Sequence, residues 1–191
     1  MGDVERQIRR SIEVKQAFLA SGGAKILEKM AAAVLKALRK GNRVYLCGNG
    51  GSAADSQHIA GEFVGRFMME RAPLPCVALT TDTSVLTCLA NDYSFDGVFE
   101  RQVNAHVRKG DVLLALSTSG NSPNVLLAVA AAKKRGAVTI GFSGRGGGKL
   151  LKAADLCLVA PDDQSARIQE LHITCGHILC GLVESGYFKR R

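Results

Sequence analysis

The chain has 191 residues, of which 47% are hydrophobic and 22% charged, and its formal net charge is +8. This length and composition are those of a globular domain and exclude a fibrous or intrinsically disordered protein. The positive charge would suit a phosphorylated ligand. Because the Lys and Arg residues are scattered along the chain, however, charge alone does not indicate a nucleic-acid partner.

The six cysteines lie mostly within apolar runs, and none belongs to a C-x-x-C pair. This spacing indicates buried thiols in a reducing compartment rather than a disulfide scaffold. The first residues show no apolar segment of a signal peptide, and no run approaches the ~18 apolar residues that a membrane span needs. We therefore expect a cytoplasmic protein with no membrane partner.

Two amphipathic helices are predicted for the first forty residues. Val4, Ile8 and Ile12 recur at four-residue steps, and a second helical pattern follows a break at residues 21–23. Neither helix is needed to cover the sheet predicted below, so we expect both to serve in assembly.

Beyond residue 41, short apolar runs alternate with helical stretches. This alternation predicts an α/β fold with a doubly wound, five-stranded parallel sheet flanked by helices, because parallel strands need a helical crossover between them. The strands are expected at residues 44–47, 76–79, 112–116, 138–142 and 156–160, and the helices at 53–67, 83–89, 97–106, 123–135 and 164–188.

A glycine-rich turn follows the first strand and opens a helix. Its residues Gly48-Asn49-Gly50-Gly51-Ser52-Ala53 match G-x-G-x-x-A, the fingerprint of dinucleotide-binding folds. The acidic residue expected at the tip of the second strand is missing, since Asp82 lies too far along. We therefore disfavour a dinucleotide and expect the backbone N–H groups of this turn to approach another ligand.

A second ligand loop follows the third strand. Ser117, Thr118, Ser119 and Ser122 supply four hydroxyl groups just before a helix that opens with Pro123. Hydroxyl groups and N–H groups at a helix start suit a phosphate monoester. The alternative is a hydroxyl-rich turn in which Ser122 is an ordinary N-cap.

Two helices carry candidate metal ligands. His58 and Glu62 are four residues apart and share one helical face, and Gln169 and His177 share a face of the last helix. A zinc finger is disfavoured, because the four potential ligands on that helix point in directions too far apart to bind one tetrahedral ion. These residues are His172, Cys175, His177 and Cys180. We interpret His172 as a surface or interface histidine. Arg66 could steady Glu62 or approach an anionic substrate.

These motifs together resemble the sugar isomerase (SIS) domain family and, within it, the phosphoheptose isomerases. The resemblance rests on Gly48–Ser52, Ala90–Asp92, Ser117–Ser122, and Arg167–Glu170 with His177, and covers residues 41–184. It implies one SIS domain over residues 1–191, with helices in 1–40 and the α/β core and last helix in 41–191. Some relatives have an acidic residue where this chain has Ala166.

The resemblance also implies a homotetramer with active sites at subunit interfaces and one zinc ion per subunit. The implied reaction converts sedoheptulose 7-phosphate to D-glycero-D-manno-heptose 7-phosphate, for ADP-heptose and lipopolysaccharide synthesis. The implied metal ligands are His58, Glu62, Gln169 and His177. The expected substrate contacts are Asn49, Gly50, Gly51, Ser52, Glu62, Asn91, Asp92, Ser117, Thr118, Ser119, Ser122 and Gln169.

Aldose–ketose isomerisation requires a base that shuttles one proton and an electrophile that stabilises the enediolate. Glu62 is our choice of base and His177 of acid. Since a carboxylate cannot be a tight ligand and a free base at once, we expect either that Glu62 loosens from the metal or that the ion mainly orients the substrate.

A non-catalytic binding protein on the same fold is the alternative function. Residues 69–71, 81–84 and 94–95 are similar to the DnaA initiator-associating protein about as closely as to the isomerases. The metal residues do not separate the two, because that relative retains similar ones. Turnover of the sugar phosphate, compared with capture of the initiator, distinguishes them.

Overall fold

A five-stranded parallel sheet forms the centre of the computed structural model, which describes residues 2–188. Its strand order is β2-β1-β3-β4-β5, and all four neighbouring pairs are parallel, as predicted. The strands are β1 (Val44–Cys47), β2 (Cys76–Ala78), β3 (Val112–Ser117), β4 (Val138–Ser143) and β5 (Leu156–Val159). Each lies within one residue of its expected bounds.

Alternate side chains of the strands enter two separate cores, one on each face of the sheet. Leu46 and Leu114, partners in the β1–β3 register, are buried in one core, whereas Tyr45 and Leu113 are buried in the other. Burial on both faces explains why the strands read as continuous apolar runs in the sequence.

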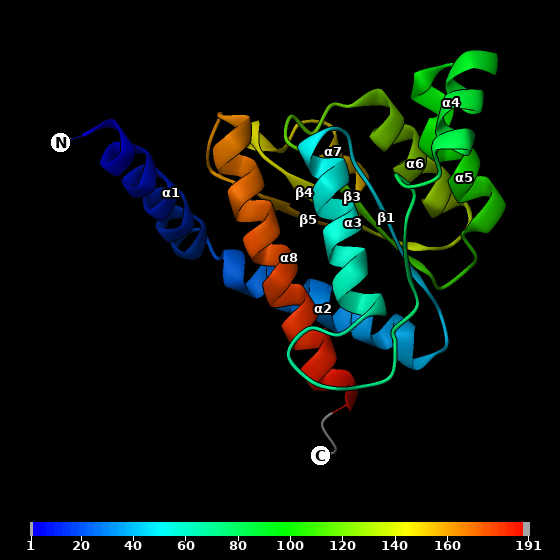
Figure 1. Cartoon of the computed structure of the whole chain (residues 1–191), viewed down its shortest axis with the longest axis horizontal. Helices are drawn as coiled ribbons and strands as arrows, with labels where there is room; N and C mark the ends of the chain where they lie inside the picture. The colour runs from blue at the N-terminus through cyan, green and yellow to red at the C-terminus, as the bar shows by residue number, and fades with distance from the viewer. Residues whose placement is uncertain (1, 189–191) are drawn as a thin grey trace.

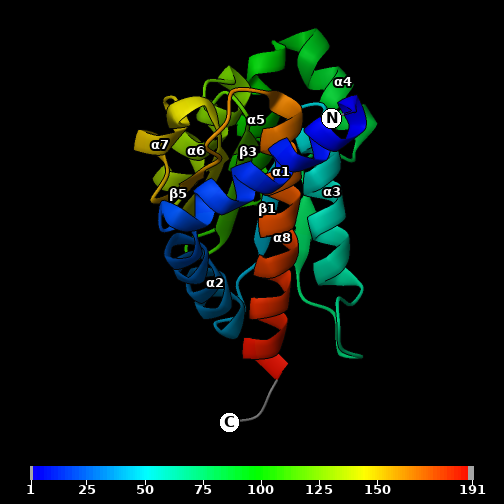
Figure 2. The same ribbon diagram turned by 90° about the vertical axis from the view of Figure 1, so that its left-hand side faces the viewer.

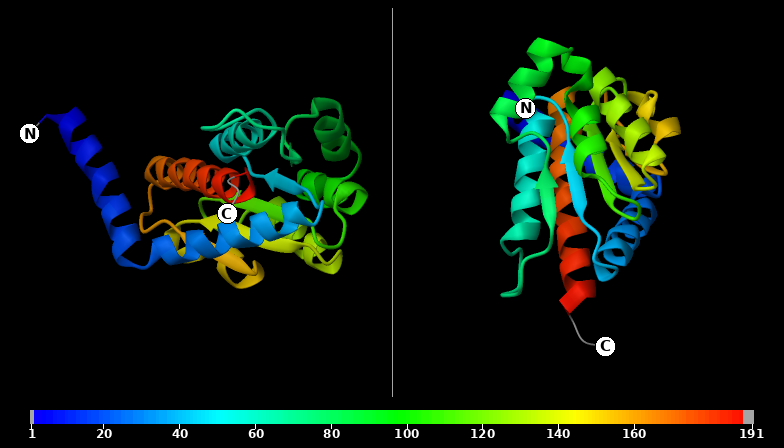
Figure 3. Two further views of the ribbon diagram at one scale, coloured as in Figure 1. Left: turned by 90° about the horizontal axis from the view of Figure 1, so that it is seen from below. Right: turned by 90° about the vertical axis from the view of Figure 1, so that its right-hand side faces the viewer.

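Helices cover both faces of the sheet (Figures 1 and 3). The first core is closed by α2 (Gly23–Arg39), α3 (Gly51–Val64) and α8 (Ser165–Phe188), and the second by α5 (Val98–His106), α6 (Pro123–Lys134) and α7 (Leu150–Ala153). The helix α4 (Thr83–Asp92) contains no buried residue. The expected helices appear within three residues of their predicted bounds, but α7 and the short 3-10 turns Phe95–Gly97 and Arg145–Gly147 were not predicted.

The first helix, α1 (Asp3–Ala20), projects from the body of the protein (Figures 1 and 3). Only its second half reaches the first core, through Val14 and Phe18, whereas α2 buries Leu27, Met30, Val34 and Leu38 there. The expectation that neither N-terminal helix covers the sheet is therefore wrong for α2. Among the helices of residues 2–188, none is both long enough and apolar enough to cross a membrane.

The helices α3 and α8 lie side by side and run in the same direction (Figures 1 and 2). Gly176 of α8 allows this approach, because a Cβ atom there would lie 2.6 Å from Cδ1 of Ile59 on α3. The loops after β1 and β3 leave the carboxyl ends of adjacent strands on either side of the topological switch point, where open α/β sheets bind ligands.

Candidate active site

The glycine loop, residues 48–52, is fixed to the start of α6 by a pair of amide groups. Asn49 Nδ2 donates to Asn124 Oδ1 and Asn124 Nδ2 donates to Asn49 Oδ1, both at 2.9 Å. Asn124 is buried and lies directly after the Pro123 that opens α6. These reciprocal hydrogen bonds tie the glycine loop to the end of the serine loop, residues 117–122, so the two predicted ligand loops form one unit.

The same glycine loop also touches the start of α8. A Cβ atom at Gly51 would lie 2.6 Å from Nε2 and 2.7 Å from Oε1 of Gln169, so this amide packs directly against the glycine. Ser52 is buried behind the loop, and its N–H donates to Asn49 O at 2.9 Å. Gln169 therefore faces the glycine loop within its own chain.

Three hydroxyl groups converge in the serine loop. Ser117 Oγ lies 3.0 Å from Ser122 Oγ and 3.5 Å from Ser119 Oγ, and the Asn121 N–H donates to Ser119 Oγ at 3.1 Å. Ser122 occupies the N-cap position of α6, but its side chain makes no capping hydrogen bond. The ordinary N-cap of the alternative interpretation is therefore not observed, and the hydroxyl groups gather around one point.

A tight turn at Gly120 packs the serine loop against residues 143–149. Gly120 has φ +64°, and a Cβ atom there would collide with the carbonyl oxygen of Gly147 and lie 2.6 Å from Ser143 Oγ. Across the same contact, the Lys149 N–H donates to Asn121 Oδ1 at 3.1 Å. The glycine-rich segment after β4 thus acts as a support for the serine loop.

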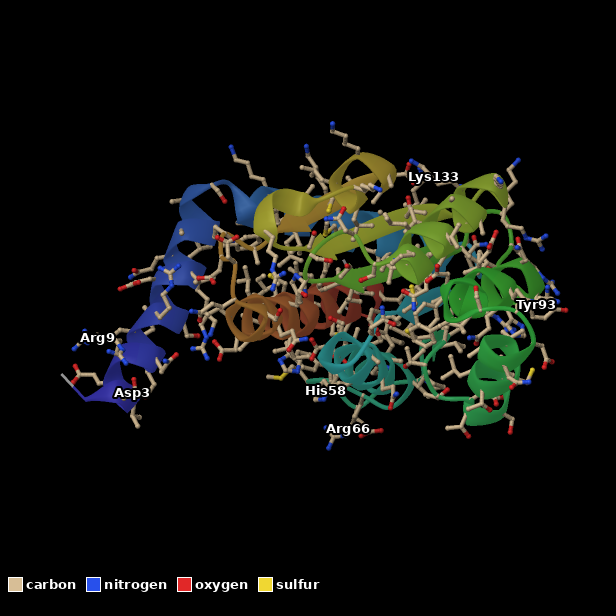
Figure 4. All side chains as sticks on the ribbon, turned by 90° about the horizontal axis from the view of Figure 1, so that it is seen from above. Asp3, Arg9, His58, Arg66, Tyr93 and Lys133 are labelled. Carbon is tan, nitrogen blue, oxygen red and sulfur yellow. The ribbon has the colours of Figure 1, made fainter. Side chains whose placement is uncertain are left out.

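A cluster of three donor side chains joins α3 to α8. His58 Nε2 lies 3.2 Å from Glu62 Oε1 and 2.9 Å from His177 Nε2. Ligand atoms of the three residues all lie within 4.8 Å of one another. His58 is half exposed and Glu62 is 23% exposed, so solutes can reach the cluster. Figure 4 labels His58 on the outer side of α3.

This donor set fits a zinc ion. Two imidazoles and one carboxylate are typical of zinc sites that leave a further position open. A buried carboxylate supports the fit: Asp55, one turn before His58 on α3, has its Oδ2 buried with no hydrogen-bond partner among the described residues. Burial raises the pKa of Asp55 above its usual value, while the His58 and His177 rings act to lower it. A cation nearby would stabilise this carboxylate.

The fourth predicted ligand, Gln169, lies apart from this cluster within one chain. It is eight residues before His177 on α8, a rise of ~12 Å, and side chains on a helix lean toward its N-terminus. Its amide is beside Gly51, seven residues before His58 on α3.

The remaining predicted residues have other surroundings. Asn91 and Asp92, at the exposed end of α4, hydrogen-bond to each other at 2.9 Å and not to either loop. Arg66 pairs with Glu70 at 3.5 Å, and its side chain points away from the ribbon (Figure 4). It therefore does not steady Glu62.

The interpretation of His172 as a surface or interface histidine is wrong. Its side chain is fully buried, and Nε2 lies 3.0 Å from the carbonyl oxygen of Ser143. Burial lowers its pKa to about 4, so the ring is neutral at pH 7 and donates this hydrogen bond. The residue links α8 to the end of β4.

Two residues of the site were missed in the sequence. Asp55 precedes His58 by three residues and Glu62 by seven, a spacing that places all three on one helical face and could have revealed it. Asn124 carries no comparable sequence signal, because its partner Asn49 is 75 residues away.

Comparison with known proteins connects this geometry to a family. Residues 8–144 match the family model described as SIS domain. The chain is 56% identical to the phosphoheptose isomerase of Rhodospirillum rubrum over 84% of this chain and 86% of the relative. It is 52% identical to the phosphoheptose isomerase of Aquifex aeolicus, over 95% of this chain and 94% of the relative. The structure of the phosphoheptose isomerase from Neisseria gonorrhoeae superposes with a TM-score of 0.90 at 44% identity, covering 95% and 97% of the two chains.

Proposed function

The chain belongs to the SIS domain family and is a sugar-phosphate isomerase, and we propose that it converts sedoheptulose 7-phosphate to D-glycero-D-manno-heptose 7-phosphate. The observation that carries the proposal is the pairing of a hydroxyl-lined anion loop with a separate three-donor cluster. The names of the relatives support a heptose phosphate as the substrate, and the geometry supports the proposal of a phosphate site and a separate proton-transfer site.

In this proposal the serine loop holds the phosphate and the glycine loop holds the sugar chain. Three converging hydroxyl groups and the N–H groups at the start of α6 suit a phosphate dianion. Asn49, positioned by Asn124, and Gln169, beside Gly51, present amide groups to the sugar hydroxyls. Asn91 and Asp92 remain proposed sugar contacts on α4.

Glu62 and His177 carry the proton transfers. Glu62 removes a proton from C1 of the ketose, which leaves an enediolate, and later returns the proton to C2. His177 moves a proton from the C1 hydroxyl to the C2 oxygen, so that the carbonyl ends at C1. One Glu62 oxygen faces His58 at 3.2 Å, and we assign proton removal to the other.

His58, Glu62 and His177 would hold one zinc ion per subunit, and Gln169 is the fourth proposed ligand. When bound, zinc supplies a Lewis acid that stabilises negative charge on the substrate oxygens. Since Gln169 lies about two helical turns from the cluster in its own chain, we infer that a neighbouring copy provides it.

A composite site also follows from the length of α3. Gly51 and Glu62 are eleven residues apart on this helix, a rise of ~16 Å. An extended seven-carbon sugar phosphate spans only about 10 Å, judged from standard single-bond lengths. We therefore propose that the glycine and serine loops of one copy face Glu62 of another, within a homotetramer in which each chain is a single SIS domain.

Turnover of a panel of ketose phosphates, with zinc added and then removed by chelation, tests the proposal. We expect activity with sedoheptulose 7-phosphate that is lost on chelation and restored by zinc. Activity that prefers another ketose phosphate would reassign the substrate. If the wild-type protein isomerises no sugar phosphate with zinc supplied, the proposal fails, and capture of the initiator tests the binding alternative.

A further inference from the structure

A buried ion pair encloses the end of α3 that carries Glu62. Arg71 Nε lies 2.8 Å from Glu184 Oε1, and each side chain is only 2% exposed. Arg71 belongs to the segment between α3 and β2, and Glu184 to the last turns of α8. Neither residue belongs to the proposed site. Removing two charged groups from water costs free energy, so a buried ion pair is weak evidence for a stabilising role. The other contacts of the two side chains therefore indicate the function of the pair.

Glu184 holds the backbone of the segment that follows α3. Its Oε1 accepts from the Phe67 N–H at 3.0 Å, and its Oε2 accepts from the N–H groups of Met68 at 2.8 Å and Met69 at 3.1 Å. Burial alone would raise the pKa of Glu184, but the N–H groups of Met68 and Phe67, together with Arg71, outweigh it and hold the pKa below its usual value. The carboxylate is therefore charged at neutral pH and fixes three successive residues.

Arg71 caps the C-terminus of α3. Its Nη2 donates to the carbonyl oxygen of Glu62 at 2.7 Å, and its Nη1 donates to those of Phe63 at 2.8 Å and Gly65 at 3.2 Å. The last carbonyl groups of a helix have no partner within the helix, and a cation there is also favoured by the helix dipole. Arg71 thus fixes the backbone from which the Glu62 side chain projects.

The same pair reaches His177 through Phe67. The rings of Phe67 and His177 are stacked, with centroids 5.8 Å apart and planes inclined by 19°. The Phe67 ring also lies beside Gly181, one turn after His177, where a Cβ atom would meet it at 3.4 Å, an ordinary van der Waals distance. Because Glu184 holds the Phe67 N–H, it determines where this ring meets His177.

We propose that Arg71 and Glu184 are positioning residues for the isomerase reaction: together they set the Glu62 carboxylate and the His177 ring relative to each other. The inference rests on the proposed roles of Glu62 and His177. This role differs from a general stabilising role, because the pair is connected to both catalytic residues. Arg71 hydrogen-bonds to the backbone of Glu62, and Glu184 hydrogen-bonds to Phe67, whose ring stacks on His177.

Glu184→Gln tests the pair, and Asp162→Asn is the matched control. Asp162 is also a carboxylate with a 2% exposed side chain, and it accepts from Arg10 Nη2 at 2.6 Å and from the Gln164 N–H at 2.7 Å. We expect Glu184→Gln to lower kcat ~10–100-fold, as is typical when residues behind a metal or catalytic site are changed, with KM altered less than about threefold. The control should lower thermal stability but leave kcat within about twofold.

A second measurement on metal-free protein separates this inference from the proposed function. The chain has four histidines, so the ring signals can be assigned by NMR, with His106 and His172 as internal references. Loss of the Phe67 stack should move the His177 ring-proton signals downfield in Glu184→Gln and not in Asp162→Asn. This shift is expected even if the wild type isomerises no sugar phosphate, a result that would end the proposed function alone.

Unchanged His177 signals in folded Glu184→Gln would overturn the inference, as would unchanged kcat in an active enzyme. If Glu184→Gln does not fold, Arg71→Lys decides by the same measurements. Lysine keeps the charge but lacks the planar fork that bonds Glu184 and several carbonyl groups at once. We expect it to lower kcat and shift the His177 signals in the same direction, and wild-type values of both would overturn the inference.

Discussion

At the scale of the residue, the proposed chemistry depends most on Glu62. Glu62→Gln keeps the shape of the side chain and an oxygen that faces His58, but it removes the base. We expect turnover to fall ~10²–10⁴-fold while the substrate still binds, measured by steady-state kinetics and direct titration. Glu70→Gln is the control, since the Glu70 side chain is 90% exposed and, within residues 2–188, forms an ion pair with Arg66 alone. Near-normal isomerisation by Glu62→Gln would place the base elsewhere.

The serine loop allows a separate residue-scale prediction about binding. Replacing Ser119 and Ser122 together with alanine removes two hydroxyl groups that converge near Ser117 Oγ. Hydrogen bonds to a charged group contribute ~1.5–3 kcal/mol each, so we expect affinity for the phosphorylated sugar to fall more than about tenfold by calorimetry. Ser21→Ala, which removes an exposed hydroxyl between α1 and α2, should leave affinity unchanged. If the double variant and the wild type bind the sugar phosphate with equal affinity, the assignment of the phosphate to this loop is wrong.

At the scale of the element, His172 couples α8 to the end of β4, and this contact should depend on pH. Its pKa is about 4 in the folded protein against an ordinary value of 6.5, so between these values the unfolded chain binds more protons than the folded one. Stability therefore rises with pH across this window and is lost as pH falls. From pH 6.5 to 5 the loss is about 2 kcal/mol, at ~1.4 kcal/mol per pH unit.

His172→Gln retains a donor for the Ser143 carbonyl oxygen and removes the titrating ring. Although less stable at pH 7.5, this variant should lose about 2 kcal/mol less than the wild type between pH 7.5 and 5, measured by urea denaturation. His106→Gln changes an exposed histidine at the end of α5 and should follow the wild-type curve. Parallel curves for His172→Gln and the wild type would show that the buried ring does not titrate with unfolding.

The elements that the sequence predicts well are those whose signal is local. The five strands are apolar on both faces, and His58 and Glu62 meet because four residues make one helical turn. The four-residue helix α7 is too short to show a period, and it follows a glycine-rich segment that suggests a loop.

The contacts that the sequence does not reveal join distant segments. Asn49 and Asn124 are 75 residues apart, and Arg71 and Glu184 are 113 residues apart. No periodicity pairs them, because their proximity depends on how the helices pack on the sheet. His172 was misjudged for the same reason: only the packing of α8 against β4 shows that its ring is buried.

At the scale of the whole molecule, α1 provides the apolar surface for the proposed tetramer. Val4, Ile8 and Ile12 form a stripe at four-residue steps and are 74%, 57% and 49% exposed. Next to α1, a groove between α2 and α8 is lined by residues that include Phe18, Leu27 and Ile178. Such exposed apolar surface is typical of a protein interface.

Ile8→Asp with Ile12→Asp should reduce the mass measured by light scattering to that of a smaller species and lower activity. Leu127→Asp, at a 39% exposed position on α6, is the control and should keep the wild-type mass. A wild-type protein that is monomeric at micromolar concentration and active would instead show that one chain holds the entire site.

A composite site predicts that two inactive variants restore each other. Glu62→Gln lacks the base but retains the serine loop, whereas the Ser119/Ser122 double alanine variant lacks the loop hydroxyls but retains the base. After the two are unfolded together and refolded as mixed tetramers, we expect part of the wild-type activity to return. Separately refolded and then combined samples are the control. If mixed tetramers form but activity does not return, Glu62 and the serine loop of one site belong to the same chain.

The position of α8 in the chain has a consequence for how the enzyme is made. α8 packs against both α2 and α3, and contacts such as Arg39 to the carbonyl oxygen of Gly186 span 147 residues. Proteins are translated from the N-terminus, so α2, α3 and the whole sheet leave the ribosome before the helix that completes their shared core. A nascent chain that ends before His177 and Glu184 has only two of the three residues of the donor cluster and no Arg71 ion pair. We therefore expect activity to be acquired in one late step of synthesis, and chains released from ribosomes stalled within α8 to contain the whole sheet and both ligand loops but to be catalytically inert.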